Sequence, residues 1–113
     1  MRNDTEWLKD IQDEIGLIEK YSAKGEEVFQ KDELIQTWMV HHLQIIGEAA
    51  SKLSEHLRQK YSSIPWRDVI SMRNFIVHQY FGVDLEEIWN TVIYDVPVLK
   101  YNIIQILKDA DNS

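Results

Sequence analysis

The chain has no cysteine, which excludes disulfides, zinc–thiolate sites and thiol nucleophiles. No stretch approaches the roughly 20 apolar residues that a membrane-spanning helix needs. The first residues, MRNDTEWLKD, also lack the apolar segment of a secretory signal. We therefore expect a cytoplasmic protein with no membrane partner.

Proline and glycine are scarce, with two prolines and four glycines in 113 residues. Few breakers favour long helices, and apolar residues recur mainly at helical spacing rather than in strand alternation. No internal repeat is visible. The sequence predicts a single all-α domain over residues 1–113, folded as an antiparallel up-and-down bundle of four or five helices.

Caps and breakers set the expected helix limits. The first helix should start at a cap near Asp4 or Thr5 and stop near Gly25, and the second should run from about Asp32 to about Tyr61. The third should run from Pro65 to His78 or Tyr80, where Gly82 follows as a stop.

The last helical stretch is expected over residues 85–107. Asp84 is suited to cap it, with Glu87 three residues later. Pro97 should produce a kink or a new start, with Asp95 as a local cap.

Gly47 lies in the middle of the second predicted helix, where glycine costs about 1 kcal/mol relative to alanine. A glycine there suggests that another helix packs closely against the segment GEAAS.

Metal and nucleotide motifs are missing. No Glu-x-x-His pair of a di-iron bundle and no glycine-rich phosphate loop occurs. His41 and His42 are adjacent and point to different faces of a helix, so one should be semi-buried and the other exposed. His56, between Glu55 and Arg58, should lie on the surface. We expect no metal and no cofactor.

The net charge of −7 argues against general electrostatic binding of nucleic acid. The charge is uneven, however. Residues 52–80 carry five basic and two acidic side chains, a balance of +3, which leaves −10 for the remainder. This region can hold a polyanion, or it can be a solvated helix face of mixed charge.

The segment RNFIVHQYFGVD carries Arg73, His78 and Tyr80. On an unbroken helix Arg73 and His78 would lie roughly 140° apart, so they would need a frayed helix end or a facing second copy to meet. An arginine–histidine pair without a metal suits cleavage of RNA through its 2′-hydroxyl. The spacing alone equally allows a helix-end histidine beside a surface arginine.

The surrounding segments add specificity. RNFIVHQYF, IPWRDVISM before it, IIGEAASKL in the second predicted helix and DLEEIWNTVIYDVPVLK after it occur in one order. With this combination the chain resembles the HepT-like toxins of the HEPN superfamily, over most of residues 34 to 107.

The resemblance implies a metal-independent ribonuclease that is the toxin of a type VII toxin–antitoxin pair. It implies Arg73 and His78 as catalytic residues at a homodimer cleft, with larger assemblies left open. Tyr80 would be the site at which a cognate nucleotidyltransferase antitoxin of the MNT type attaches AMP and silences the toxin. Asn74 is expected in a supporting polar role.

Two other interpretations remain at this point. The chain can be a non-catalytic helical partner or substrate subunit of a nucleotidyltransferase. It can also be a purely structural homo-oligomer, in which Arg73 and His78 would be replaceable.

Overall fold

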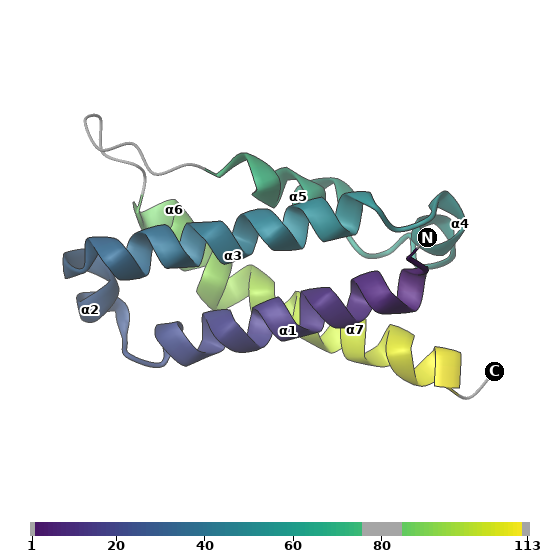
Figure 1. Cartoon of the computed structure of the whole chain (residues 1–113), viewed down its shortest axis with the longest axis horizontal. Helices are drawn as coiled ribbons and strands as arrows, with labels where there is room; N and C mark the ends of the chain where they lie inside the picture. The colour runs from purple at the N-terminus through teal and green to yellow at the C-terminus, as the bar shows by residue number, and fades with distance from the viewer. Residues whose placement is uncertain (1, 76–84, 112–113) are drawn as a thin grey trace.

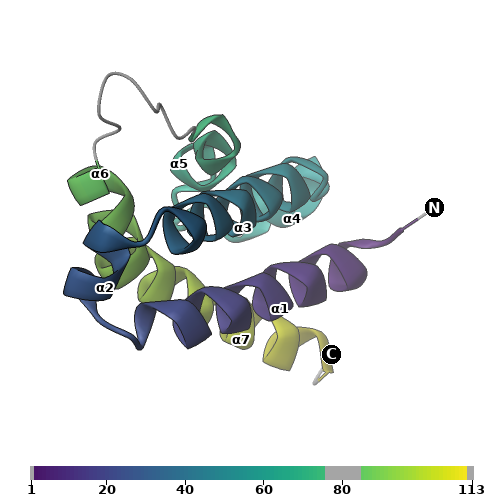
Figure 2. The ribbon, with the colours of Figure 1, turned by 60° about the vertical axis from the view of Figure 1, so that its left-hand side comes forward.

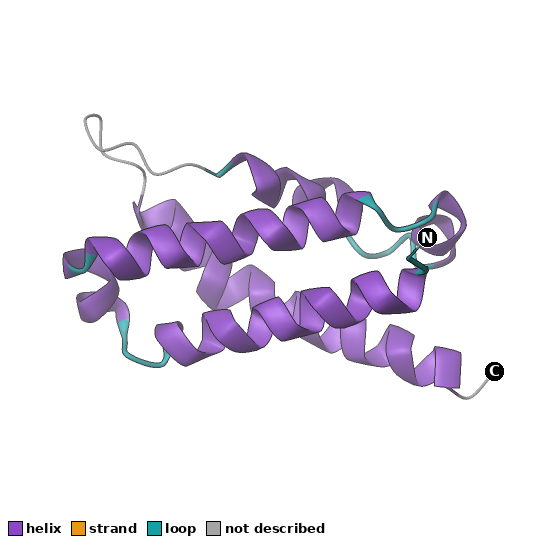
Figure 3. Ribbon diagram, in the orientation of Figure 1, coloured by secondary structure: helices purple, strands orange, loops and turns teal. Residues whose placement is uncertain are grey.

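The computed structural model describes residues 2–75 and 85–111, which form helices joined by short loops, with no strand among them (Figure 3). The predicted all-α fold is confirmed. In this described part, no helix is long and apolar enough to cross a membrane.

Three long helices form the frame of the bundle. They are α1 (Asp4–Ser22), α3 (Glu33–Ser51) and α7 (Val96–Asp111). Helix α1 packs beside α3 on one side and contacts α7 on the other (Figures 1 and 2). A short helix that the sequence did not predict, α2 (Glu26–Lys31), connects α1 to α3.

The core runs along the inner faces of these helices. Side chains that are almost fully buried come from α1, α2, α3, α6 and α7: Leu8, Ile11, Ile15, Ile18, Phe29, Met39, Leu43, Ile46, Ile88, Val96 and Ile103. Their spacing of three and four residues on α1, α3 and α7 is the apolar periodicity that predicted the helices.

The predicted second helix, from Asp32 to Tyr61, is wrong in its length. It ends at Ser51, and a separate helix α4 (Glu55–Lys60) follows. The Ser54 hydroxyl caps α4 by accepting from the Leu57 amide at 3.1 Å. The Asp4 carboxylate fixes this break because it accepts from both the amide and the hydroxyl of Ser54, at 2.8 Å and 2.6 Å.

The cap of α1 is one residue earlier than predicted. The Asn3 side chain accepts from the Glu6 amide at 2.9 Å. Asp4 is therefore inside the helix, where its carboxylate is available for Ser54.

The predicted third helix also ends too early to reach His78. Helix α5 (Trp66–Ser71) tightens into a 3₁₀ turn, η1 (Met72–Asn74), and Phe75 is already extended, with ψ at 135°. The Phe75 amide closes the turn by donating to the Met72 carbonyl at 3.2 Å. The predicted stop at Gly82 and cap at Asp84 lie outside the described residues.

The last stretch stays helical across Pro97. Helix α6 (Leu85–Asn90) continues into a π-helical turn, η2 (Thr91–Asp95), and then into α7. A proline ring clashes with the carbonyl four residues earlier in an α-helix, and the wider π turn relieves that crowding. Since Val96 has helical backbone angles, no cap at Asp95 is required.

Candidate active site

Arg73 lies in η1, the short turn that ends α5. Its side chain is 46% exposed, so the guanidinium reaches solvent from a backbone that packs on α3. A cation at the end of a helix is also favoured by the helix dipole.

Gly47 allows this packing. A Cβ atom on Gly47 would overlap the backbone nitrogen of Arg73 and would lie 2.8 Å from the carbonyl oxygen of Ile70. Only a residue without a side chain permits such an approach. The predicted close contact at the GEAAS segment is confirmed, and the neighbour is the turn that carries Arg73.

Gln44 of α3 fixes Phe75, the residue that follows the turn η1. Its side-chain amide donates to the carbonyl of Phe75, in a partly buried contact. In a continuing helix this carbonyl would accept from a backbone amide four residues later. The bond to Gln44 therefore stabilises the extended conformation of Phe75 in place of a further helical turn.

Glu48 lies between two cations. One carboxylate oxygen is 3.8 Å from Nη1 of Arg73, and the other is 3.7 Å from Nζ of Lys52. All three side chains are about half exposed, so each pair is weak and open to exchange with another anion. Arg73 and Lys52 together offer a small cationic surface that Glu48 partly neutralises.

Three residues of α3, Gln44, Gly47 and Glu48, contact the turn Met72–Phe75, and we call them the α3 cradle. The sequence predicted the role of Gly47 and missed Gln44 and Glu48. Their spacing of three and four residues places all three on one face of α3, a signal visible once Gly47 is taken as a contact point.

The other predicted site residues lie as follows. Asn74 is exposed in η1, next to Arg73. His78 and Tyr80 lie outside the described residues.

Of the remaining histidines, His41 and His56 are exposed as predicted, and His42 is buried, at 3% exposed, where the prediction was a semi-buried residue. His42 is hydrogen-bonded through Nδ1 to Glu14 of α1, and its ring forms a T-shaped pair with the ring of Trp38. Among the described residues, no group of three or more histidine, aspartate or glutamate side chains is placed to hold a metal ion.

Comparison with known proteins identifies the family. The sequence profile of the family described as Ribonuclease HepT-like matches residues 11–106. This chain therefore belongs to the HepT-like family of the HEPN superfamily.

Three relatives show how far the similarity extends. A protein of Methanocaldococcus jannaschii named "Gamma-glutamylcyclotransferase and putative RNase" is 37% identical over all of this chain and 52% of its own length. This chain thus spans about half of that relative. A "putative RNase" of Caldanaerobacter subterraneus subsp. tengcongensis is 37% identical over 81% of this chain and 82% of its own length. A "probable ribonuclease HepT" of Thermococcus cleftensis is 37% identical over 88% of this chain and 91% of its own length. No solved structure matches.

Proposed function

We propose that this protein is a metal-independent endoribonuclease, with Arg73 and His78 as its catalytic residues. Membership of the HepT-like family and the ribonuclease names of its relatives support the activity. The observation that carries the assignment of Arg73 is its half-exposed guanidinium on a backbone that the α3 cradle fixes.

The early end of the helix supports a joint role for the two residues. An unbroken helix would have kept Arg73 and His78 roughly 140° apart. Because Phe75 is extended, that constraint does not apply beyond Asn74.

In the proposed reaction, His78 takes the proton from the 2′-hydroxyl or gives one to the leaving 5′-oxygen. Histidine is suited to both steps near neutral pH. Arg73 binds the phosphate and stabilises the charge that develops on its oxygens. Lys52, just after the last residue of α3, adds a second cation, 3.7 Å from the carboxylate that Arg73 also contacts. The product would be a 2′,3′-cyclic phosphate.

Cleavage of a single-stranded RNA by purified chain in EDTA tests this proposal. Wild-type protein should cleave, whereas Arg73→Ala and His78→Ala should each lose most activity. Arg67→Ala is the matched control, since Arg67 is an exposed arginine of α5 in the same basic region. Equal activity in all four proteins would remove Arg73 and His78 from the mechanism.

We also propose that two copies form the cleft. An exposed stripe on α3 supports this, because Leu34 is 82% and Trp38 is 42% exposed, and His41 continues the row. The same row reaches Glu48, beside Arg73, so a second copy on the stripe would lie next to the cradle.

The double variant Leu34→Glu/His41→Glu tests the dimer, because both side chains are exposed and the fold should tolerate it. Light scattering should report a monomer, and cleavage should fall. A dimer of unchanged stability would place the interface elsewhere.

The proposed regulation is AMP attachment to Tyr80 by a nucleotidyltransferase antitoxin. Tyr80 follows His78 by two residues, so a bulky anion there would occupy the phosphate position and repel RNA. Tyr80→Phe should remain toxic when the antitoxin is present. Full neutralisation of that variant would refute modification at Tyr80 as the main mechanism.

The second candidate is a non-catalytic subunit that binds a nucleotidyltransferase. It is favoured by the acidic net charge of −7, which opposes RNA binding outside the basic region. Intact RNA in the EDTA assay, together with stable binding of the nucleotidyltransferase, would support this candidate.

A further inference from the structure

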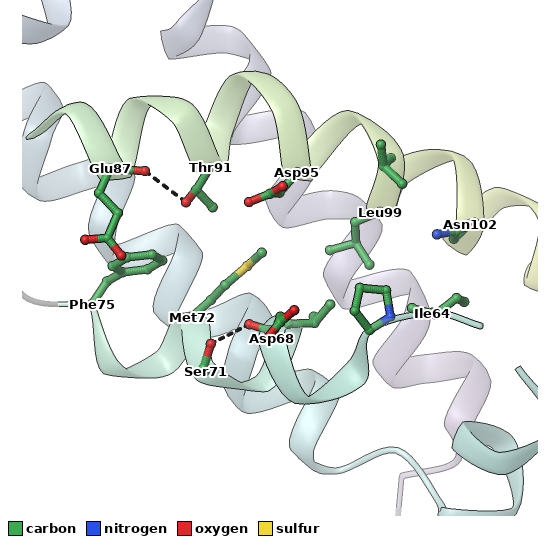
Figure 4. A pocket seen from close by; sticks show the side chains of 13 residues that line it. Ile64, Asp68, Ser71, Met72, Phe75, Glu87, Thr91, Asp95, Leu99 and Asn102 are labelled. Atoms are coloured by element: carbon green, nitrogen blue, oxygen red, sulfur yellow. Dashed lines mark hydrogen bonds between the residues drawn. The ribbon is translucent and has the colours of Figure 1, made fainter. Parts of the chain in front are cut away.

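A groove separates α5 and η1 on one side from α6, η2 and α7 on the other (Figure 4). It encloses about 330 Å³. Most of its lining is apolar and comes from Ile64, Val69, Met72, Phe75, Val98 and Leu99, with the polar side chains of Thr91 and Asn102 among them.

The rim of the groove is acidic. Asp68 lies on the α5 side, and Glu87 and Asp95 lie on the opposite side. Among the described residues, the carboxylates of Asp68 and Asp95 form no ion pair or hydrogen bond. Among the residues that the structure describes, no lysine, arginine or histidine lines the groove. An occupant would therefore meet two free carboxylates around an apolar floor.

The apolar surface continues outside the groove along one face of η2 and α7. Tyr94 is 68% exposed, Val98 is 58% exposed and Tyr101 is 64% exposed. Their spacing of four and three residues aligns them on one helix face, and Val98 also lines the groove. Large side chains that are exposed together mark interaction surfaces more often than single ones do.

The Arg73 side chain and the groove lie on different sides of η1. The Arg73 guanidinium lies beside Glu48 of α3, whereas Met72 and Phe75, its neighbours in sequence, line the groove toward α6 and α7. Carboxylates at the rim repel a phosphate backbone, so RNA is not a suitable occupant.

A second copy of this chain is also a poor occupant. In a twofold-symmetric contact both copies use the same surface, and the described lining of this groove presents carboxylates and no cation that could pair with them. Like charges across an interface oppose binding. The occupant should instead carry positive charge.

We propose that this groove docks a segment of a different protein, one that inserts apolar side chains between α5 and α7 and places lysine or arginine at the rim. The carboxylates of Asp68 and Asp95 would pair with those cations. The rings of Tyr94 and Tyr101 are suited to cation–π contacts with them. This docking surface rests on the groove alone and does not require ribonuclease activity.

The probe is a fluorescent synthetic peptide with one leucine face flanked by lysine and arginine. A second peptide replaces the leucines with serine, and a third replaces the basic residues with glutamate. Fluorescence anisotropy with the full chain should show binding of the first peptide only. Binding should weaken as salt rises, because the rim contacts are exposed charges.

Matched variants distinguish peptide binding in the groove from general attraction of the basic peptide to an acidic protein. Asp68→Asn/Asp95→Asn should weaken binding of the first peptide about tenfold, since two exposed ion pairs are lost. Asp13→Asn/Glu26→Gln removes the same charge from exposed sites on α1 and α2 and should change binding less than about twofold. Val98→Ser should also weaken binding, because it removes apolar contact from an exposed position.

Three results would overturn the proposal. The first is equal binding of the leucine peptide to wild type and to Asp68→Asn/Asp95→Asn. The second is competition for the groove by a single-stranded RNA oligonucleotide. The third is a change in oligomeric state of the Val98→Ser variant by light scattering, which would make the groove an interface between copies of this chain.

Discussion

The backbone nitrogen of Arg73 lies so close to Gly47 that a Cβ atom at position 47 would overlap it. Alanine is otherwise favoured over glycine within a helix by about 1 kcal/mol. We predict that Gly47→Ala nonetheless lowers the free energy of unfolding by about 1–2 kcal/mol, because overpacking of this kind costs about 1–3 kcal/mol. RNA cleavage should fall more than the folded fraction, since Arg73 must shift. Urea denaturation and cleavage rates measure both effects.

Gly16→Ala is the control for that experiment. Gly16 lies in α1, and a Cβ atom there would meet no atom within 4 Å. We expect it to raise the free energy of unfolding by about 0.5–1 kcal/mol and to leave cleavage unchanged. The same stabilisation from Gly47→Ala would contradict the close contact with Arg73.

Glu48→Gln tests the charge beside Arg73. Both partners are about half exposed, so we expect a change of less than about 0.5 kcal/mol in the free energy of unfolding. The KM for RNA should fall about two- to fivefold at low salt, because the phosphate no longer competes with a carboxylate for Arg73 and Lys52. Glu33→Gln, an exposed change at the start of α3, should leave KM unchanged. A higher KM in Glu48→Gln would show that the carboxylate assists binding.

The partly buried pair of Glu14 and His42 links α1 to α3. His42 is 3% exposed, and in the described part of the chain its Nε2 has no hydrogen-bond partner. Glu14→Leu should lower the free energy of unfolding by about 1–3 kcal/mol, because it leaves Nδ1 unpaired as well.

A double-mutant cycle with His42→Leu tests that pair. The loss in Glu14→Leu/His42→Leu should be smaller than the sum of the single losses by about 0.5 kcal/mol or more. Additive losses would mean that the contact contributes no stability.

The environment of Tyr61 predicts that the free energy of unfolding depends on pH at alkaline pH. Burial raises the pKa of the Tyr61 phenol, and its hydrogen bond to the Asp109 carboxylate, at 3.1 Å, raises that pKa further. The folded state thus favours the neutral phenol. The stability that the neutral Tyr61 phenol contributes to the fold is fully present below the unfolded pKa of about 10. It is lost as the pH rises through the folded pKa.

Wild type should therefore lose more stability above about pH 10 than Tyr61→Phe does. Chemical denaturation at neutral and alkaline pH measures the difference. Tyr101→Phe, a change at an exposed tyrosine of α7, serves as the control. Parallel pH profiles for wild type and Tyr61→Phe would refute the link.

Helix periodicity predicted the main elements, because each long helix buries one stripe. The apolar stripes of α1 and α7 can be recognised from their own sequence periodicity, without knowing which helix packs against them. The break after Ser51 was not predictable in the same way, since Asp4 stabilises it from 50 residues away. Ser54 is a cap signal within the sequence, but an apolar stripe through Leu53 and Leu57 continued across it.

The end of the third helix shows a second limit. Its apolar run predicted a helix to His78 or Tyr80, whereas the 3₁₀ turn ends at Asn74. Helix α3 holds this end, because Gly47 packs against the backbone of Arg73 and Gln44 donates to the carbonyl of Phe75. Gly47 made the contact on α3 predictable, because a glycine in the middle of a helix lowers helix stability and therefore indicates a close neighbour. Gln44 and Glu48 carried no such signal, because polar residues are common on helix surfaces.

The most direct test uses an RNA oligonucleotide that the purified chain cuts at one position, in EDTA. The cut fragment should end in a 2′,3′-cyclic phosphate, and a single 2′-deoxy nucleotide at that position should abolish cleavage. His78→Ala should lose most of this cleavage. Cleavage of the 2′-deoxy substrate, or undiminished cleavage by His78→Ala, would contradict the proposed ribonuclease mechanism.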